Sequence, residues 1–187
     1  MRLRKIARAI AVAMAVIVGA GIGPVMIPSG AVLAAVPAGA ELNIDSTSVL
    51  SEGTVENASG EGWTYDSETN TLALTDYSGE SITGSSLGDL IITVENQCTV
   101  NNGIDLSSGP ENNITIKGID YGTLILRNTN GYGLYVQDAD LTIGTGDDYL
   151  WFEADVSSTD NSQDAHGGVF VIKSDGCARR MLHQCQS

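Results

Sequence analysis

The sequence predicts an all-β protein built as a solenoid, in which short strands stack coil upon coil. From Trp63 onward, short segments place apolar residues at every second position, which is typical of half-buried strands. Gly, Asn, Asp and Ser separate these segments, and these residues favour turns. Similar segments recur about every 25–35 residues, and repeats of that length indicate a solenoid.

The alternating segments lie at 72–74, 90–94, 114–116, 124–126, 134–136 and 141–143. Successive side chains of a strand point to opposite faces, so one set in each segment faces the interior. The side chains expected to point inward are Leu90, Ile92, Ile114, Ile116, Leu124, Leu126, Leu134, Val136, Leu141 and Ile143. No amphipathic helix is predicted between 41 and 172.

Two internal repeats support the solenoid. In the first, an acidic or amide residue precedes an apolar-x-Ile segment, at 89–92, 113–116 and 140–143. In the second, Gly precedes an apolar-x-apolar segment, at 103–106, 133–136 and 168–171. Each coil of a solenoid buries its apolar face on the next coil, which explains such repeats. A β-sandwich is the alternative, because its strands also recur at regular spacing.

The first 40 residues have the three parts of a secretory signal peptide. A basic head precedes an apolar run at 9–22, and the small residues of AVLAAVPAGA follow. Cleavage fits after Ala34 or after Ala40. We therefore predict a bacterial protein at the cell surface or in the medium, with 1–40 engaging the membrane only during export. An uncleaved anchor is the alternative, although a membrane span needs about 20 apolar residues.

The remaining chain divides into three parts. Residues 41–61 are polar and small and predict a lead-in strand or a linker, and 62–172 form the predicted β-solenoid domain. The tail at 173–187 lacks alternation and holds Cys177 and Cys185. This tail indicates a truncated solenoid or a shifted reading frame, with an ordinary disordered tail as the alternative.

The charge of the predicted mature chain limits its partners. Between 41 and 172 there are 22 acidic residues and two basic ones, Lys117 and Arg127, which gives a net charge of −20. A surface this acidic repels nucleic acid and anionic lipid. Cations and neutral, hydroxyl-rich ligands suit it better. The alternative is that the acidity serves solubility alone.

One segment carries a resemblance to a known family. Residues 62–79 read GWTYDSETNTLALTDYSG, and strands of related pattern follow at 88–92, 114–118 and 122–126. This opening resembles that of repeat-built extracellular proteins of Gram-positive bacteria, and is similar to the secreted carbohydrate-binding β-helix family, whose shape is that of pectate lyases. The resemblance covers about 62–143. It implies a right-handed parallel β-helix, an extracellular or cell-surface location and sugar binding.

Aromatic residues near the start of the solenoid are the first candidate ligand contacts. Trp63, Tyr65 and Tyr77 each offer an apolar ring face and a polar edge, which suits stacking on a sugar ring. The alternative is that these rings pack as a cap on the first coil.

A second set of aromatic residues lies later in the solenoid and comprises Tyr132, Tyr135, Tyr149 and Trp151. Tyr135 stands between two apolar neighbours, so its ring is expected to point outward. If several of these rings share a face, they form a strip that holds a polysaccharide or other glycan. The alternative is ordinary surface tyrosine, which strands favour in any case.

Acidic residues that lie close in the sequence form a candidate calcium site, because Ca²⁺ prefers oxygen ligands. They are Asp138, Asp140, Asp147 and Asp148. Their spacing matches no EF-hand, the Gly-Gly-x-Gly-x-Asp repeat is absent, and aspartates that form turns are the alternative. No cofactor is required by the sequence, and calcium is the one candidate.

Catalysis finds little support in the sequence. His166 and His183 are the only histidines, and no Gly-x-Ser-x-Gly segment occurs. Cleavage of the pectate-lyase type needs a basic residue beside bound Ca²⁺, and the predicted solenoid offers only Lys117 and Arg127. We therefore predict a non-catalytic carbohydrate-binding protein. A structural or adhesive solenoid that binds protein partners is the alternative, and a polysaccharide lyase or hydrolase is the second.

Overall fold

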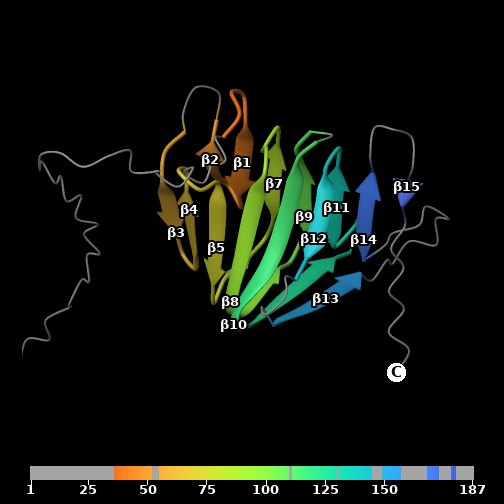
Figure 1. The fold of residues 1–187 in the computed structure, drawn as a ribbon. Coiled ribbons are helices and arrows are strands. Elements are labelled where there is room, and N and C mark those ends of the chain that lie inside the picture. Colours follow the sequence, from red (N-terminus) through yellow and green to blue (C-terminus); the bar gives the residue numbers. More distant parts are fainter. Residues whose placement is uncertain are drawn as a thin grey trace, which may run out of the picture. The chain divides into compact units, whose positions relative to one another are not determined.

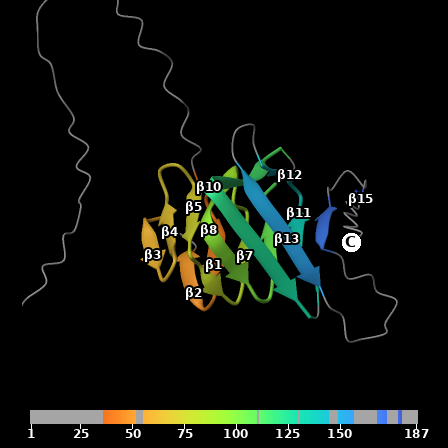
Figure 2. The same cartoon turned by 90° about the horizontal axis from the view of Figure 1, so that it is seen from below.

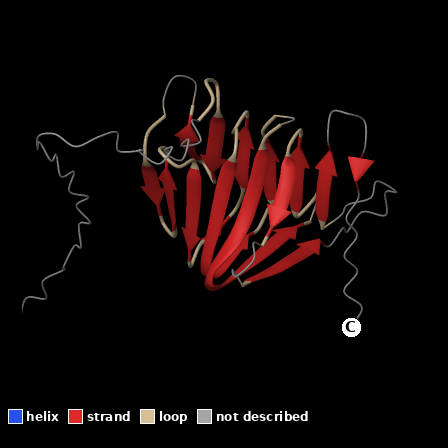
Figure 3. Cartoon of the chain, in the orientation of Figure 1, coloured by secondary structure: helices blue, strands red, loops and turns tan. Residues whose placement is uncertain are grey.

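The computed structural model of the chain describes residues 36–51, 55–109, 111–129, 131–144, 149–156, 168–172 and 178–179. Every regular element in these ranges is a β-strand (Figure 3). The all-β prediction is therefore confirmed. Within the same ranges there is no helix long and apolar enough to cross a lipid bilayer.

The strands form two sheets. Their bounds are β1 (Glu41–Ile44), β2 (Thr47–Leu50), β3 (Ala58–Gly60), β4 (Trp63–Asp66), β5 (Thr71–Thr75), β6 (Ser78–Gly79), β7 (Ile82–Ser85), β8 (Leu90–Val100), β9 (Ile104–Ser107), β10 (Asn113–Asn128), β11 (Leu134–Gln137), β12 (Asp140–Ile143), β13 (Leu150–Val156), β14 (Val169–Ile172) and β15 (Ala178–Arg179). One sheet has the order β15-β14-β11-β9-β7-β1-β2. The other has the order β12-β10-β8-β5-β4-β3, with β13 paired to β10 and β6 paired to β8 (Figure 1).

Parallel pairs make up the middle of both sheets. In one sheet, β5 pairs with β8, β8 with β10, and β10 with both β12 and β13. In the other, β7 pairs with β9, β9 with β11, and β11 with β14. An antiparallel sandwich would join these same strands in opposite directions. From β5 to β14, the chain thus returns to each sheet in the same direction.

The registers of these pairs align the predicted repeats. Ile92 of β8 lies opposite Ile116 of β10, which lies opposite Ile143 of β12. In the other sheet, Ile104 of β9 lies opposite Leu134 of β11. Apolar positions therefore stack on apolar positions from one turn of the chain to the next, as the period of the sequence requires.

The long strands bend where residues adopt a left-handed backbone. Asn96 in β8 has φ of 60°, and Asp120 and Tyr121 in β10 have φ of 48° and 68°. Each bend divides its strand into two parts. The first part of β10 pairs with β12, and the part that begins at Gly122 pairs with β13 (Figure 2).

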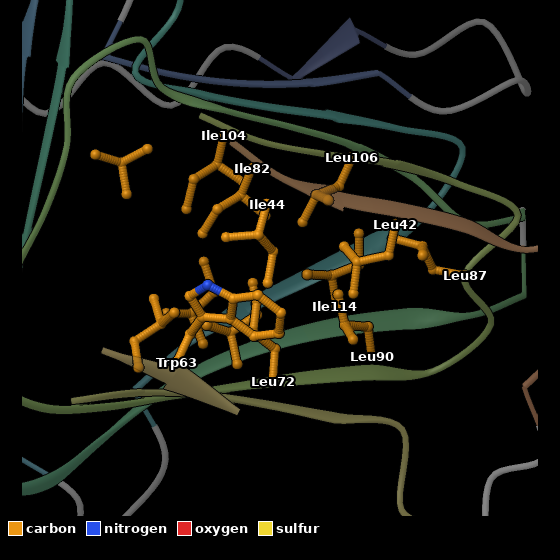
Figure 4. Packing of buried hydrophobic residues seen from close by; sticks show 14 of the residues in the cluster. Leu42, Ile44, Trp63, Leu72, Ile82, Leu87, Leu90, Ile104, Leu106 and Ile114 are labelled. Atoms are coloured by element: carbon orange, nitrogen blue, oxygen red, sulfur yellow. The ribbon is translucent and has the colours of Figure 1, made fainter. Parts of the chain in front are cut away.

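The core lies between the two sheets. Leu72 and Leu90 of one sheet face Ile82 and Ile104 of the other (Figure 4), and these side chains are at most 1% exposed. Eight of the ten side chains predicted to point inward have no exposed surface, namely Leu90, Ile92, Ile114, Ile116, Leu124, Leu126, Leu134 and Val136.

The other two predictions concern β12. Leu141 is partly buried and packs against the core, and Ile143 is in register with the buried Ile116 but is 38% exposed. The physical reason is that β12 ends the order of its sheet within the described chain. Its outer edge lacks the next strand that would cover the side chain.

Segment 41–61, predicted as a lead-in strand or linker, contributes strands to both sheets. The antiparallel hairpin β1–β2 extends one sheet at β7, and the antiparallel strands β3 and β4 extend the other at β5. Asp45 forms the β1–β2 turn with φ of 55°. Its carboxylate accepts hydrogen bonds from the Tyr77 hydroxyl at 3.0 Å and from the backbone N of Ser81 at 3.2 Å. The folded unit therefore begins before the predicted boundary at residue 62.

The last part of the predicted signal peptide also contacts the core. Ala40 is 3% exposed, its backbone N donates a hydrogen bond to the Pro37 carbonyl at 3.2 Å, and Val36 packs against the core. A chain that starts at Ala35 should therefore be more stable than one that starts at Glu41, by about 1–2 kcal/mol for the lost apolar burial. Urea denaturation of the two chains measures the difference, and equal midpoints would show that this segment contributes nothing.

The ends of the sequence lie mostly outside the described residues. Residues 1–35 are outside them, so the basic head and apolar run of the signal peptide are too. In the predicted tail, β15 pairs antiparallel with β14. The rest of 173–187, which includes Cys177, Cys185 and His183, lies outside the described residues.

Candidate functional site

A hollow of about 460 Å³ lies on the outer side of β7, β9 and β11. It is lined by polar and aromatic side chains, among them Thr83, Asn102, Asp105, Asn128, Tyr132 and Tyr135. Hollows that combine aromatic surface with a few polar groups are typical of small-molecule sites. We call this site the groove.

Strand register places three of these side chains in one row. Thr83 of β7 lies opposite Asp105 of β9, which lies opposite Tyr135 of β11. Phe170 of β14 continues the row beyond Tyr135. Asp105, Tyr135 and Phe170 each stand between apolar residues in their strands, and Thr83 follows the buried Ile82, so the alternation turns all four outward. Neighbouring residues in the row are about 4.8 Å apart.

Three rings stack at one end of the groove. Tyr132 and Phe170 have ring centroids 4.7 Å apart and planes 13° apart. Tyr135 lies 5.7 Å from Phe170 at 15°, and 5.5 Å from Tyr132 at 28°. Nearly parallel rings hold one another in position. Phe170 was missed as a site residue, although its place in the Gly-apolar-x-apolar repeat matches that of Tyr135.

Hydrogen bonds fix the loop that carries Tyr132. The side-chain amide of Asn128 donates to the carbonyls of Asn102 at 3.0 Å and Tyr132 at 2.9 Å. Gly103 has φ of 79°, and a Cβ there would lie 2.5 Å from the Tyr132 carbonyl oxygen. Glycine is therefore needed at that position for the two loops to approach this closely. The close backbone contact between Gly103 and Tyr132 therefore helps to fix the shape of the groove.

The groove raises the pKa values of two of its acidic groups. Partial burial raises the pKa of the Asp105 carboxyl. Partial burial also raises the pKa of the Tyr135 hydroxyl, and the negative charge of Asp105 adds to the effect. The groove thus offers a carboxylate acceptor, the exposed side-chain amide of Asn102 and ring faces to a ligand. These are the groups that bind hydroxyl-rich molecules.

The first set of predicted sugar contacts is buried. Trp63 is 6% exposed, and Tyr65 and Tyr77 are each 2% exposed. The Tyr65 hydroxyl donates to the Asn70 side-chain oxygen at 2.8 Å. The prediction that these rings bind ligand is wrong, because a sugar ring needs an exposed face. Their alternative role as a cap fits, since all three belong to the hydrophobic core.

The second predicted set does not form one strip. Tyr132 and Tyr135 lie beside β14, but Tyr149 precedes β13, which pairs with β10 in the other sheet. Tyr149 stacks on Tyr121, with centroids 5.0 Å apart and planes 16° apart. Trp151 lies in β13 and is 68% exposed. The single-strip prediction is wrong because the chain changes sheets between these residues, and Tyr121 was missed.

Of the predicted calcium ligands that are described, Asp138 lies in a turn and Asp140 begins β12. Asp138 has φ of 53°, and its carbonyl accepts a hydrogen bond from the Gly109 backbone N at 2.7 Å. The Asp140 backbone N donates to the Asn112 carbonyl at 2.9 Å. Asp147 and Asp148 lie outside the described residues. Among the described part of the chain, no three His, Cys, Asp or Glu side chains are grouped as a metal site would require.

Comparisons with known proteins find no matching family model, no matching curated protein and no matching solved structure. The resemblance of 62–143 to the carbohydrate-binding β-helix family accordingly rests on its sequence motif. The features that bear on the function of the protein are therefore the groove and the exposed aromatic rings.

Proposed function

We propose that the protein is an exported, non-catalytic carbohydrate-binding protein. The groove is the observation that carries the proposal, because Tyr132 and Tyr135 stand beside Asp105 and the exposed side-chain amide of Asn102 in one hollow. A sugar presents apolar ring faces and hydroxyl edges. Aromatic rings contact the faces, and carboxylate and amide groups exchange hydrogen bonds with the hydroxyls.

The fold we propose for this protein is a right-handed parallel β-helix. Three series of parallel pairs support it, namely β5-β8-β10-β12, β6-β8-β10-β13 and β7-β9-β11-β14. In each series the next strand belongs to the next turn of the chain. The right-handed sense is the usual one for connections between parallel strands. Such a helix presents the outward side chains of successive coils as rows, and the groove lies on one of them.

The favoured ligand is a neutral polysaccharide. Asp105 lies in the groove, and the chain between 41 and 172 carries a net charge of −20. Anionic sugars are therefore repelled unless a cation bridges them, and Ca²⁺ is the candidate. The signal-peptide pattern of 1–40 supports binding outside the cytoplasm.

Tyr135→Ala should weaken binding of a cellulose-type oligosaccharide about 2–10-fold, because one ring contact contributes about 0.5–1.5 kcal/mol. Tyr135→Phe keeps the ring and should bind nearly as well as the wild type. Isothermal titration calorimetry measures both affinities. A pectin-type oligosaccharide, with Ca²⁺ and with chelator, tests the bridged alternative.

The matched control for this titration is Thr64→Ala, which changes an exposed side chain of β4, away from the groove. It should leave the affinity unchanged. Absence of heat with every sugar, or equal affinities for Tyr135→Ala and wild type, would contradict the proposed groove and favour the structural or adhesive alternative.

A further inference from the structure

Exposed apolar side chains gather where β10 bends. Tyr121 is 74% exposed, Tyr149 and Trp151 are each 68% exposed, and Ile119 is 42% exposed. Large apolar side chains this exposed are unusual when they are neighbours, and they mark interaction sites. This corner lies at the bend of β10 and the start of β13 (Figure 2), whereas the groove lies on β7, β9 and β11 of the other sheet and reaches β10 only at its last residue, Asn128.

The rings at this corner have a defined arrangement. Tyr121 and Tyr149 are stacked 5.0 Å apart and 16° from parallel. Leu150, the residue after Tyr149, lies opposite Gly122, and Trp151 lies opposite Thr123. Residues two apart along a strand point to the same side, about 6.6 Å from each other. Trp151 therefore stands beside the stacked pair on the same outward surface.

The backbone holds the rings in this arrangement. Asp120 and Tyr121 both adopt the left-handed conformation, which is unfavourable for residues other than glycine. A Cβ at Gly118 would collide with the Tyr149 carbonyl, and one at Gly122 would collide with the Val94 carbonyl. Gly118 thus allows the backbone at Tyr149 to approach β10 closely, and Gly122 allows the same of β8 at Val94. Strained backbone that presents exposed rings is typical of functional positions.

We propose that Tyr121, Tyr149 and Trp151 form a second carbohydrate-binding site, which we call the corner platform. Its occupant is a neutral polysaccharide chain, whose sugar rings stack on the exposed ring faces. Two observations support this occupant. The exposed groups are flat aromatic rings, and the acidic charge of the chain, including the adjacent Asp120, disfavours anionic ligands. The inference rests on the proposed function, since it assumes the same class of ligand.

Two sites on different sheets give the protein a capability that one site lacks. One molecule binds a long polysaccharide at two points, or joins two polysaccharide chains. The second contact of a bivalent molecule forms without a new diffusional encounter, so retention on a polymer exceeds that of either site alone. Short oligosaccharides should show two sites of modest affinity.

The test uses the full secreted chain with a cellulose-type hexasaccharide in calorimetry and with hydroxyethyl cellulose in affinity electrophoresis. Wild type should bind two hexasaccharides per molecule. Trp151→Ala and Tyr121→Ala should weaken the second site about 2–10-fold per ring removed. The double variant should bind one hexasaccharide, and its retention by the polymer should fall by more than either single variant's. Tyr121→Phe should restore wild-type behaviour.

Ile119→Ser is the matched control at the same corner, because it removes an exposed apolar side chain that is not a ring. It should leave sugar binding unchanged, and thermal unfolding checks that every variant is folded. If Ile119→Ser weakens binding as much as Trp151→Ala, the corner is a general apolar surface and the platform is refuted.

The outcomes also separate the two proposals. If the platform variants still bind as wild type does while Tyr135→Ala loses binding, the corner platform is wrong and the groove stands. If only the platform variants lose binding, the groove is wrong and the platform stands. If wild type binds neither probe, both proposals fail.

Discussion

Asn70→Ala is expected to destabilise the folded protein by about 3–5 kcal/mol. Asn70 has no exposed surface, and its amide donates to the carbonyls of Leu87 and Asp89, each at 2.7 Å. Its side-chain oxygen accepts from the Tyr65 hydroxyl at 2.8 Å. Removal of the amide leaves these groups without partners, and each unpaired buried group costs about 1–3 kcal/mol. Urea denaturation measures the loss.

Asn96→Ala is the matched control for that experiment. Asn96 has φ of 60°, close to the 48° of Asn70, so both substitutions place alanine in the left-handed region. The amide of Asn96, however, is exposed and donates to the exposed carboxylate of Asp76 at 3.1 Å. Its loss should cost about 1 kcal/mol, mostly from the backbone. Equal losses for the two variants would show that the buried hydrogen bonds contribute nothing.

Raising the pH from 10 to 12 is expected to cost the folded protein about 5 kcal/mol. Burial raises the pKa of the Tyr65 hydroxyl to about 12. Burial, with help from the hydrogen bond to Asp45, raises the pKa of Tyr77 further. Unfolded tyrosine ionises near pH 10. Above that pH the unfolded state releases protons that the folded state retains, so stability falls by about 1.4 kcal/mol per pH unit for each tyrosine.

The alkaline loss is measured by urea denaturation at pH 8, 10, 11 and 12, with tyrosinate absorbance as a second signal. In Tyr65→Phe, one of the two buried hydroxyls is gone, so the loss between pH 10 and 12 should be about half that of wild type. The same variant should lose about 1 kcal/mol at pH 8, for its missing hydrogen bond to Asn70. A pH dependence equal to that of wild type would assign the loss to other groups.

The sequence predicts the buried side of the strands well because the period of two is a local property. Leu124 and Leu126 alternate with outward residues whatever the strands pair with, and both are fully buried. The same property makes Tyr135 point outward. Ile143 is more exposed than the pattern predicts, because its burial depends on a strand beyond β12. The sequence of β12 carries no information about that neighbouring strand.

The candidate site was predicted less well, because it depends on where the chain bends. Tyr132 precedes β11 and Tyr149 precedes β13, and these strands belong to different sheets because the chain turns after β11 at Asp138, which has φ of 53°. The alternating pattern does not reveal this turn, so residues near in sequence look like neighbours on one face. The prediction that Trp63 contacts a ligand fails for another reason. An aromatic ring with a polar edge can pack in a core or line a ligand site equally well. The outward position of Phe170 could have been predicted, because Phe170 occupies the same place in the Gly-apolar-x-apolar repeat as Tyr135.

The antiparallel strands that precede β5 and β7 have a consequence for self-association. An open strand edge pairs readily with another chain and starts aggregation. At one end of the described stack the outermost strands are β2 and β3, which have four and three residues. Strands that are this short and that pair antiparallel offer few backbone groups with which an incoming parallel strand could pair. Addition of another chain to form a fibre is therefore discouraged at the end where β2 and β3 lie.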